Sequence, residues 1–411
     1  MNQALRRDAD VIVAEAIRAV QPDAAVIRAL EGRTFPGRVL LVAAGKAAWQ
    51  MAKTAVDCLG ERLDRGVVVT KYDHVKGEIP RCVCVEAGHP VPDENSFQGT
   101  AQALSLVEGL TETDTVLFLL SGGGSALFEK PLVEGAELQD ITAQLLASGA
   151  DIVEMNTIRK RLSAVKGGRF AQWCRPAQVL TIVLSDIIGD PLDMIASGPA
   201  YPDSSTCDQA VAIAEKYHLR LSEKAWALLK QETPKALNNV TTFVSGSVKE
   251  LCAAAGKSCE QLGYTPVLLT DCLCCQAREA GSFLASVVKS HAGSGRQLAF
   301  IAGGETVVKL TGKGLGGRNQ EIALAAAAGI EGLHNAAVFS VGSDGTDGPT
   351  DAAGGYADGD TAGALRAQGL LIDSVLEQND AYHALEKSSG LIITGATGTN
   401  VNDVAVALIR P

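Results

Sequence analysis

The sequence predicts an α/β protein with two α/β domains, whose mainly parallel sheets are flanked by helices. Its 411 residues are more than one compact core usually holds, so two domains are expected. Short apolar runs alternate with helical patterns along the chain, which is typical of parallel sheets. A polar stretch without strand patterns, residues 231–239, interrupts this alternation. We therefore expect a Rossmann-like N-terminal domain over residues 1–238 and a C-terminal α/β domain over residues 239–411.

Composition narrows the class of partner. The net charge is −11 and no Lys/Arg-rich run occurs, which argues against nucleic acid, because a phosphate backbone selects a basic surface. No stretch reaches the about 18 apolar residues of a membrane span, and the N-terminal segment lacks a signal-peptide core. Ten scattered cysteines suit reduced thiols in a cytoplasm. For the C-x-x-C at Cys272–Cys275, burial is favoured over metal binding, because no second pair stands at zinc spacing.

The most informative stretch is residues 115–131, TVLFLLSGGGSALFEKP. Its apolar residues 116–120 predict a strand that is buried on both faces. The strand runs into Ser121-Gly-Gly-Gly-Ser125, where bare backbone amides and the following helix would form an anion site. A glycine turn that only allows two elements to pack closely explains the pattern equally well.

Further strands end at residues that suit a ligand. The strand at residues 38–44 ends at Gly45-Lys46, which places a cation at a strand-to-helix turn. This is not a Walker A lysine, because Ala47 replaces the Ser/Thr and no glycine stands five residues before Gly45. Strands are also expected at 66–70 and 82–86. The second of these leads to His89, for which structural and functional roles are equally consistent with the sequence.

Residues 155–169, MNTIRKRLSAVKGGR, form the most basic stretch of this acidic chain. A solvated helix face is the usual explanation of such a run, but paired glycines between Lys166 and Arg169 also suit an anion. The next strand, 179–184, is followed by Asp186 and Asp190. Acids at the carboxyl end of a parallel strand lie where open sheets bind ligands, and both could hold Mg²⁺. Asp190 could equally cap the next helix.

In the C-terminal half, Gly312, Gly314 and Gly317 satisfy the dinucleotide pattern G-x-G-x-x-G between a strand and a helix. The pattern comes late in its domain, and no acid closes the next strand at the spacing that a ribose requires. Arg318 at its end favours a terminal or transferring phosphate. An NAD(P)H-dependent oxidoreductase is therefore the second hypothesis, after phosphoryl transfer.

Eight segments in the same order resemble the bacterial and animal glycerate kinases with a MOFRL C-terminal domain, from about Ala9 to Ile409. They are GKA (45–47), LLSGGGSAL, MNTIRKRLSAVKGGR, LSDIIGDPLDMIASGP, IAGGETVV, GKGLGGRNQE, SVGSDGTDGPTDAAGG and GTNVND. The resemblance implies ATP-dependent phosphorylation of D-glycerate at its 2-hydroxyl, giving 2-phosphoglycerate and ADP, with Mg²⁺ required. It also implies an active site in the cleft between the domains. The alternatives are a hydroxypyruvate reductase and a non-catalytic sugar-phosphate-binding regulator; the acidic loop 344–351 argues against the regulator.

On this interpretation each kind of site has its candidates. The catalytic candidates are Lys46, Arg318 and Asp186. Those for the substrate or phosphate are Gly122, Gly123, Gly124, Ser125, Asn156, Arg159, Lys166, Arg169, Glu305 and Asn319. Those for the nucleotide are Gly314, Gly316, Gly317, Asn400 and Asn402, and those for metal are Asp190 and Asp344. Asp186, Asp190 and Asp344 compete for the metal and base roles. We expect ATP, Mg²⁺ and D-glycerate as ligands, no nucleic acid or membrane partner, and a monomer or homodimer.

Overall fold

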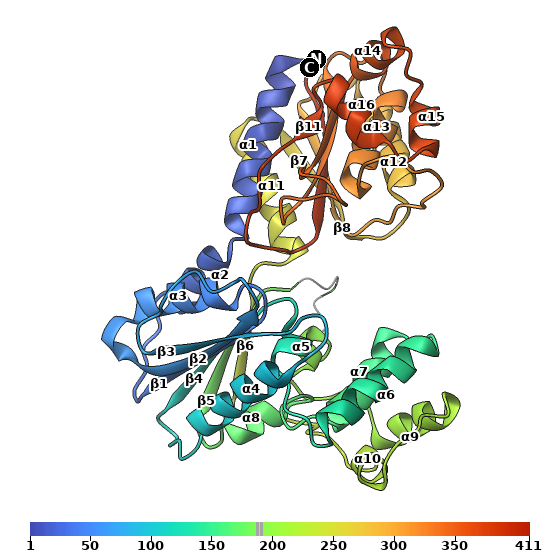
Figure 1. The fold of residues 1–411 in the computed structure, drawn as a ribbon. Coiled ribbons are helices and arrows are strands. Elements are labelled where there is room, and N and C mark those ends of the chain that lie inside the picture. Colours follow the sequence, from blue (N-terminus) through green and yellow to red (C-terminus); the bar gives the residue numbers. More distant parts are fainter. Residues whose placement is uncertain (186–188, 190–191) are drawn as a thin grey trace. The chain divides into compact units, whose positions relative to one another are not determined.

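The computed structural model describes residues 1–185, 189 and 192–411 and divides the chain into two compact units. The first unit contains residues 25–185 and 192–245, and the second contains residues 1–24 and 246–411 (Figure 1). None of the helices in the described part of the chain combines the length and the apolar character of a membrane span.

The first unit is built on a six-stranded, fully parallel sheet in the order β3-β2-β1-β4-β5-β6. Its strands are β1 (Val39–Ala44), β2 (Leu63–Lys71), β3 (Cys82–Ala87), β4 (Thr115–Leu120), β5 (Gln178–Val183) and β6 (Val240–Val244). Every residue of β1 and β4 is buried, as their apolar runs predict. The strand order reverses between these two strands, and in open α/β sheets ligands bind at the carboxyl edge of such a switch point.

Two groups of helices accompany this sheet. The helices nearest to the sheet are α2 (Pro22–Leu30), α3 (Ala48–Leu59), α4 (Glu94–Leu106), the short α5 (Gly124–Leu127) and α8 (Arg169–Trp173), with 3₁₀ turns η1 (Gly60–Arg62) and η2 (Ile195–Ser197). A helical extension with its own apolar core contains α6 (Gly135–Ala147), α7 (Ile152–Arg161), α9 (Cys207–Lys216) and α10 (Glu223–Leu229). Helix α7 begins at a capping box formed by Asp151 and Glu154.

The second unit contains a mixed sheet in the order β11-β10-β9-β12-β8-β7. Its strands are β7 (Thr265–Leu273), β8 (Leu298–Gly304), β9 (Ala336–Gly342), β10 (Gly354–Asp358), β11 (Leu391–Ile392) and β12 (Asp403–Ile409). Strand β12 lies antiparallel between β8 and β9, and Asp403 pairs with both Gly304 and Gly342. The amino end of β12 therefore meets the carboxyl ends of β8 and β9 at one edge.

Helices cover both faces of the second sheet. Alternate residues of β12 pack into different cores: Val404, Val406 and Leu408 with α1 and α11, and the residues between them with α12 and α13. The helices are α1 (Gln3–Ala19), α11 (Val248–Gln261), α12 (Ala277–His291), α13 (Arg318–Gly329), α14 (Thr361–Ala367), α15 (Ile372–Glu377) and α16 (Ala381–Lys387). The last three pack beside α13.

The predicted α/β class with two helix-flanked sheets is confirmed, and three details differ from the sequence analysis. The second sheet has one parallel pair, β7 with β8, among antiparallel ones. The compact units also differ from a division at 238/239, because β6 pairs with β5 and α1 packs on the second sheet. Burial of the C-x-x-C is wrong, because Cys272 is exposed on β7, an edge strand, and Cys275 is partly exposed.

Candidate functional site

The glycine loop of the first unit lies at the switch point of the sheet, where β1 and β4 end. The backbone amide of Lys46 donates to the carbonyl of Gly122 (2.9 Å), and Ser121 Oγ accepts from the amide of Ala47 (3.0 Å). Gly45 has φ +129°, and a Cβ there would lie 2.2 Å from Ser121 Oγ. Glycine is therefore required where the two loops are fastened together.

This loop presents free donors. Within the described residues, the backbone amides of Gly122 and Gly123 make no hydrogen bond, and both residues are partly exposed. The ammonium group of Lys46 is also exposed, and no described residue forms a hydrogen bond or an ion pair with it. Two amides and a cation at the end of parallel strands form an anion-binding arrangement.

The structure places His89 at the same loop. A Cβ on Gly123, which has φ +85°, would lie 2.9 Å from His89 Cδ2 and 3.4 Å from Lys46 Cγ. Burial, and then the charges of Lys46, Lys71 and His74, lower the pKa of the His89 imidazole. His89 is therefore a neutral imidazole at pH 7, beside the lysine. The sequence left its role open, and this position makes it a candidate site residue.

A hydroxyl chain connects α5 with α7. Ser125 Oγ lies 3.2 Å from Ser197 Oγ, and the Ser197 hydroxyl donates to Asn156 Oδ1 at 3.0 Å. Ala196 and Ser197 both have left-handed backbone conformations, with φ +50° and +61°. Such strain costs about 1–3 kcal/mol per residue and clusters at functional sites. Sequence analysis missed Ser197, because no local pattern predicts left-handed backbone at a non-glycine residue.

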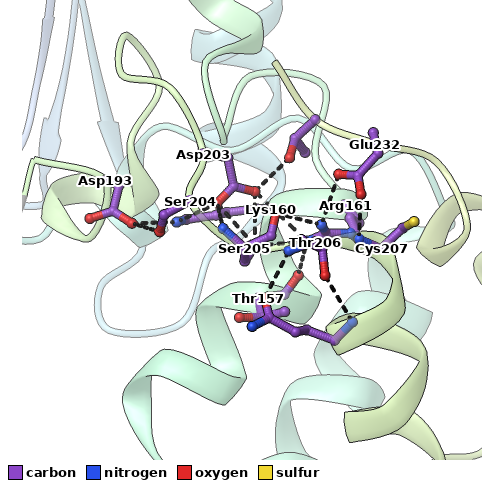
Figure 2. A network of polar contacts seen from close by, with 12 residues as sticks. Thr157, Lys160, Arg161, Asp193, Asp203, Ser204, Ser205, Thr206, Cys207 and Glu232 are labelled. Atoms are coloured by element: carbon purple, nitrogen blue, oxygen red, sulfur yellow. Dashed lines mark hydrogen bonds and ion pairs between the residues drawn. The ribbon is translucent and has the colours of Figure 1, made fainter. Parts of the chain in front are cut away.

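The basic stretch is not a solvated helix face. Lys160 and Arg161 are buried, and both belong to a polar network between α7 and the segment 203–207 (Figure 2). Lys160 Nζ lies 3.0 Å from Asp203 Oδ1, and the Arg161 guanidinium donates to the hydroxyl and carbonyl of Ser205. Burial works to raise the pKa of Asp203, but the hydrogen bond from Thr233 and the ion pair with Lys160 bring it below its usual value. These two cations are structural.

Two predicted anion ligands, Lys166 and Arg169, make hydrogen bonds inside the protein, Lys166 with its ammonium and Arg169 with Nη1 alone. Lys166 is fully buried, and its ammonium donates to the carbonyls of Ser125 (2.8 Å) and Phe128 (3.0 Å) and to Glu129 Oε2 (2.9 Å). Arg169 Nη1 donates to the backbone carbonyls of residues 160, 161 and 163. The geometry therefore gives both residues structural contacts where the sequence predicted substrate contacts.

Arg159 differs from its basic neighbours. It is half-buried, and in the described part of the chain its guanidinium has neither a hydrogen bond nor an ion pair. Burial lowers its pKa, and the nearby negative charge of Glu129 opposes this effect. Asn156 stands three residues earlier on α7, so the two side chains share a helix face. Arg159 and Asn156 remain candidates for a substrate anion.

In the second unit, Arg318 begins α13 and is held by two carboxylates. Its Nε and Nη2 reach the two oxygens of Asp403 at 2.6 and 3.1 Å, and Nη1 reaches Glu305 Oε1 at 2.9 Å. Burial works to lower the pKa of Arg318, but Asp403 and Glu305 raise it overall. Three of its five N–H donors are used, which leaves two for a ligand. Arg318 and Glu305, both predicted site residues, are thus in contact.

The amino terminus of α13 is already occupied by a carboxylate. Asp347 accepts hydrogen bonds from the backbone amides of Asn319 (3.1 Å) and Gln320 (2.8 Å). A Cβ on Gly317 would lie 2.2 Å from Asp347 Cγ. Burial, with added repulsion from Asp403, raises the pKa of Asp347 to about 6. The position that a dinucleotide pyrophosphate requires at a helix amino terminus is therefore filled by the chain itself.

The glycines before α13 also have a packing reason. A Cβ on Gly312 would lie 2.3 Å from Gln378 Cα, and one on Gly314 would lie 2.5 Å from Asp380 Cβ. Gly316 likewise faces Ala381, at 3.3 Å. Close approach of two chain segments therefore accounts for this glycine pattern, and a nucleotide role for these residues stays a prediction.

The remaining candidates lie at the edge where β9 ends and β12 begins. A Cβ on Gly342 would lie 3.3 Å from Asp344 Oδ1 and 3.4 Å from Asp403 Oδ1, so both carboxylates reach this edge. Asn402 is buried with φ +68°, and Asn400 is exposed two residues earlier. Two carboxylates suit Mg²⁺, which keeps several waters. Within residues 1–185, 189 and 192–411, no group of three or more His, Cys, Asp or Glu is arranged to hold a metal. The candidates Asp186 and Asp190 lie outside the described residues.

The chain matches two family models, a domain of unknown function, DUF4147, over residues 8–230 and the MOFRL family over residues 298–403. It is 52% identical to the D-glycerate 2-kinase of Thermotoga maritima over 99% of both chains. It is 40% identical to the glycerate 2-kinase of Pyrococcus horikoshii, over 97% of this chain and 96% of that protein. The crystal structure of the glycerate kinase from Thermotoga maritima matches the fold of this chain with a TM-score of 0.95, over 99% of this chain and 100% of that one. The chain belongs to the glycerate 2-kinase family, with its DUF4147 and MOFRL domains.

Proposed function

We propose that the protein transfers the terminal phosphoryl group of ATP to the 2-hydroxyl of D-glycerate, which gives 2-phosphoglycerate and ADP. The observation that carries this proposal is the pair of free amides at Gly122 and Gly123 beside the unpaired ammonium of Lys46. The names of the Thermotoga and Pyrococcus relatives support it independently. Phosphoryl transfer needs positioned donors and charge neutralisation rather than covalent help from the protein.

The first unit supplies groups for the transferring phosphoryl group and for the carboxylate of glycerate. We assign the amides of Gly122 and Gly123, with Lys46, to the oxygens of the transferring phosphoryl group, whose charge they neutralise in the transition state. The amide of Gly124 donates to the carbonyl of Ser121, so Gly124 supports this loop. Ser125 and Asn156 are assigned to the hydroxyls of glycerate, and Arg159 to its carboxylate, because a guanidinium binds a carboxylate in bidentate fashion. Glycerate oxygen forms a bond to phosphorus while the bond from phosphorus to ADP breaks. Asp186 is our choice for the acceptor of the hydroxyl proton, on sequence grounds alone.

The second unit supplies a fixed guanidinium. We assign the two unused donors of Arg318 to phosphate oxygens, with Glu305 and Asn319 holding the local structure. Asp344, and Asp190 from the sequence, are assigned to Mg²⁺, which would neutralise charge on the phosphates when bound. Gly314, Gly316, Gly317, Asn400 and Asn402 keep their proposed place near the nucleotide.

The position of the new phosphate tests the proposal. For 2-phosphorylation the carboxylate next to the reacting hydroxyl must bind close to the phosphoryl group, which requires several cations and amides at one place. We expect phosphorus NMR of protein with ATP, Mg²⁺ and D-glycerate to show 2-phosphoglycerate, and enolase to accept it without a mutase. A 3-phosphoglycerate product would show that the assignment of the glycerate carboxylate to Arg159 is wrong. Oxidation of NADH with hydroxypyruvate, without phosphorylation, would support the reductase hypothesis instead.

A further inference from the structure

A buried ion pair lies directly behind the glycine loop. Lys166 and Glu129 are 0% and 2% exposed, and Lys166 Nζ pairs with Glu129 Oε2, while Glu129 Oε1 has no hydrogen-bond partner in the described chain. Isolating two charges from water is unfavourable, and apolar residues of similar volume often stabilise a protein as well or better. Stability alone therefore does not explain why this site holds a lysine.

The contacts of Lys166 indicate what the pair does. Besides Glu129, its ammonium binds the carbonyls of Ser125 and Phe128, at 2.8 and 3.0 Å. These carbonyls belong to α5 and its carboxyl cap, and a four-residue helix is too short to be stable by itself. The amides of Ala126 and Leu127 in turn bind the carbonyl of Gly123. A continuous set of hydrogen bonds thus connects Lys166 with the glycine loop.

We propose that Lys166 is a positioning residue that acts through α5. It holds α5, and thereby the free amides of Gly122 and Gly123, in the orientation that binds an anion, while Glu129 keeps its charge balanced. All three donors of its ammonium are used, so Lys166 itself contacts no reactant. The kinetic consequences of this inference rest on the proposed function. The effect of Lys166 on the order of the glycine loop can be measured without any activity.

Two variants separate positioning from stability. Lys166→Met leaves the Glu129 carboxylate buried and unpaired, so we expect it to lose both thermal stability and turnover. Lys166→Met combined with Glu129→Met fills the site with apolar side chains, so we expect the melting temperature to recover to within a few degrees. Because the bonds to Ser125 and Phe128 are still missing, kcat should stay at least about tenfold below wild type. Lys216→Met, which removes an exposed ion pair with Glu154, is the control for charge loss and should keep full activity.

Hydrogen exchange of the peptide that covers residues 120–128 supplies the readout that does not depend on activity. We expect faster exchange in the double variant than in wild type, without faster exchange in β1. A double variant with wild-type turnover, or with unchanged exchange over these residues, would overturn the positioning role. If wild type shows no phosphorylation of glycerate while the double variant exchanges faster, the proposed function is wrong and the positioning role of Lys166 is supported.

Discussion

Replacement of Lys46 should separate catalysis from stability more cleanly than any other change at this site. The ammonium group is exposed and has no partner among the described residues, so Lys46→Ala removes no contact that stabilises the fold. Surface changes of this kind usually alter the free energy of unfolding by no more than about 0.5 kcal/mol. Loss of one cation from a transferring phosphoryl group, in contrast, lowers kcat by about 10³-fold or more.

Arg318→Ala should behave differently, because Arg318 pairs with a buried carboxylate. Asp403 is 5% exposed and receives two hydrogen bonds from the guanidinium. Removal of one partner of a buried pair costs about 3–5 kcal/mol. For units of about 200 residues this corresponds to a melting temperature that is lower by roughly 6–20 °C. Arg318→Ala should therefore lose turnover and stability together, whereas Lys46→Ala loses turnover alone.

The assay is an initial rate with ATP, Mg²⁺ and D-glycerate, measured below the melting temperature of every variant and beside a thermal melt. Lys53→Ala is the matched control, because Lys53 is a partly exposed lysine that pairs with Asp57 on the same helix, α3. It should keep wild-type turnover. The assignment of Lys46 to the phosphoryl group is refuted if Lys46→Ala keeps its turnover, or if its melting temperature falls as steeply as its rate.

Three further predictions follow from the site. EDTA should abolish turnover, and Mg²⁺ or Mn²⁺ but not Zn²⁺ should restore it, since the candidates are carboxylates without a His/Cys set; full activity in metal-stripped protein would exclude the metal roles. Arg159→Met should raise the KM for D-glycerate at least about tenfold and leave the KM for ATP nearly unchanged, because a charged hydrogen bond contributes about 1.5–3 kcal/mol; equal changes in both constants would contradict a carboxylate role. The pKa of Asp347 is raised to about 6 in the folded protein, so the folded state binds more protons between about pH 4 and 6. Its contribution to the free energy of unfolding should therefore fall as pH rises through this range, by on the order of 3 kcal/mol at most, and urea unfolding of Asp347→Asn should show a flatter pH dependence.

The parts of the site that the sequence predicts are those that depend on neighbouring residues. The apolar run of β4 and the glycines after it are local features, and so is the position of Lys46 after β1. Their proximity in space follows from the rule that open parallel sheets gather ligand loops at the carboxyl edge of the switch point. The same local logic predicted two helix-flanked sheets and the strands β1 to β5, but not the antiparallel pairing of the second sheet.

The parts that the sequence could not predict depend on partners far along the chain. Lys160 pairs with Asp203, and Lys166 binds the carbonyls of α5 about 40 residues earlier. A basic run therefore has the same appearance in sequence whether its cations face water or a buried carboxylate. For the same reason the expected division at 238/239 differs from the compact units, in which β6 pairs with β5 and α1 packs on the second sheet, since strand order and helix docking are decided by long-range packing.

The two glycine-rich segments of this chain show how similar sequences come to serve different chemistry. Each precedes a helix, but at α13 the helix amides bind the carboxylate of Asp347, and the glycines allow the segment 378–381 to approach. At α5 the amides of Gly122 and Gly123 have no partner within the described chain, and Lys46 lies beside them. An incoming phosphate would have to displace a bound carboxylate at α13, whereas at α5 it would satisfy donors that the described chain leaves free. The anion site of this protein is therefore expected at the glycine loop after β4, where the terminal phosphate of a nucleotide can be held for transfer.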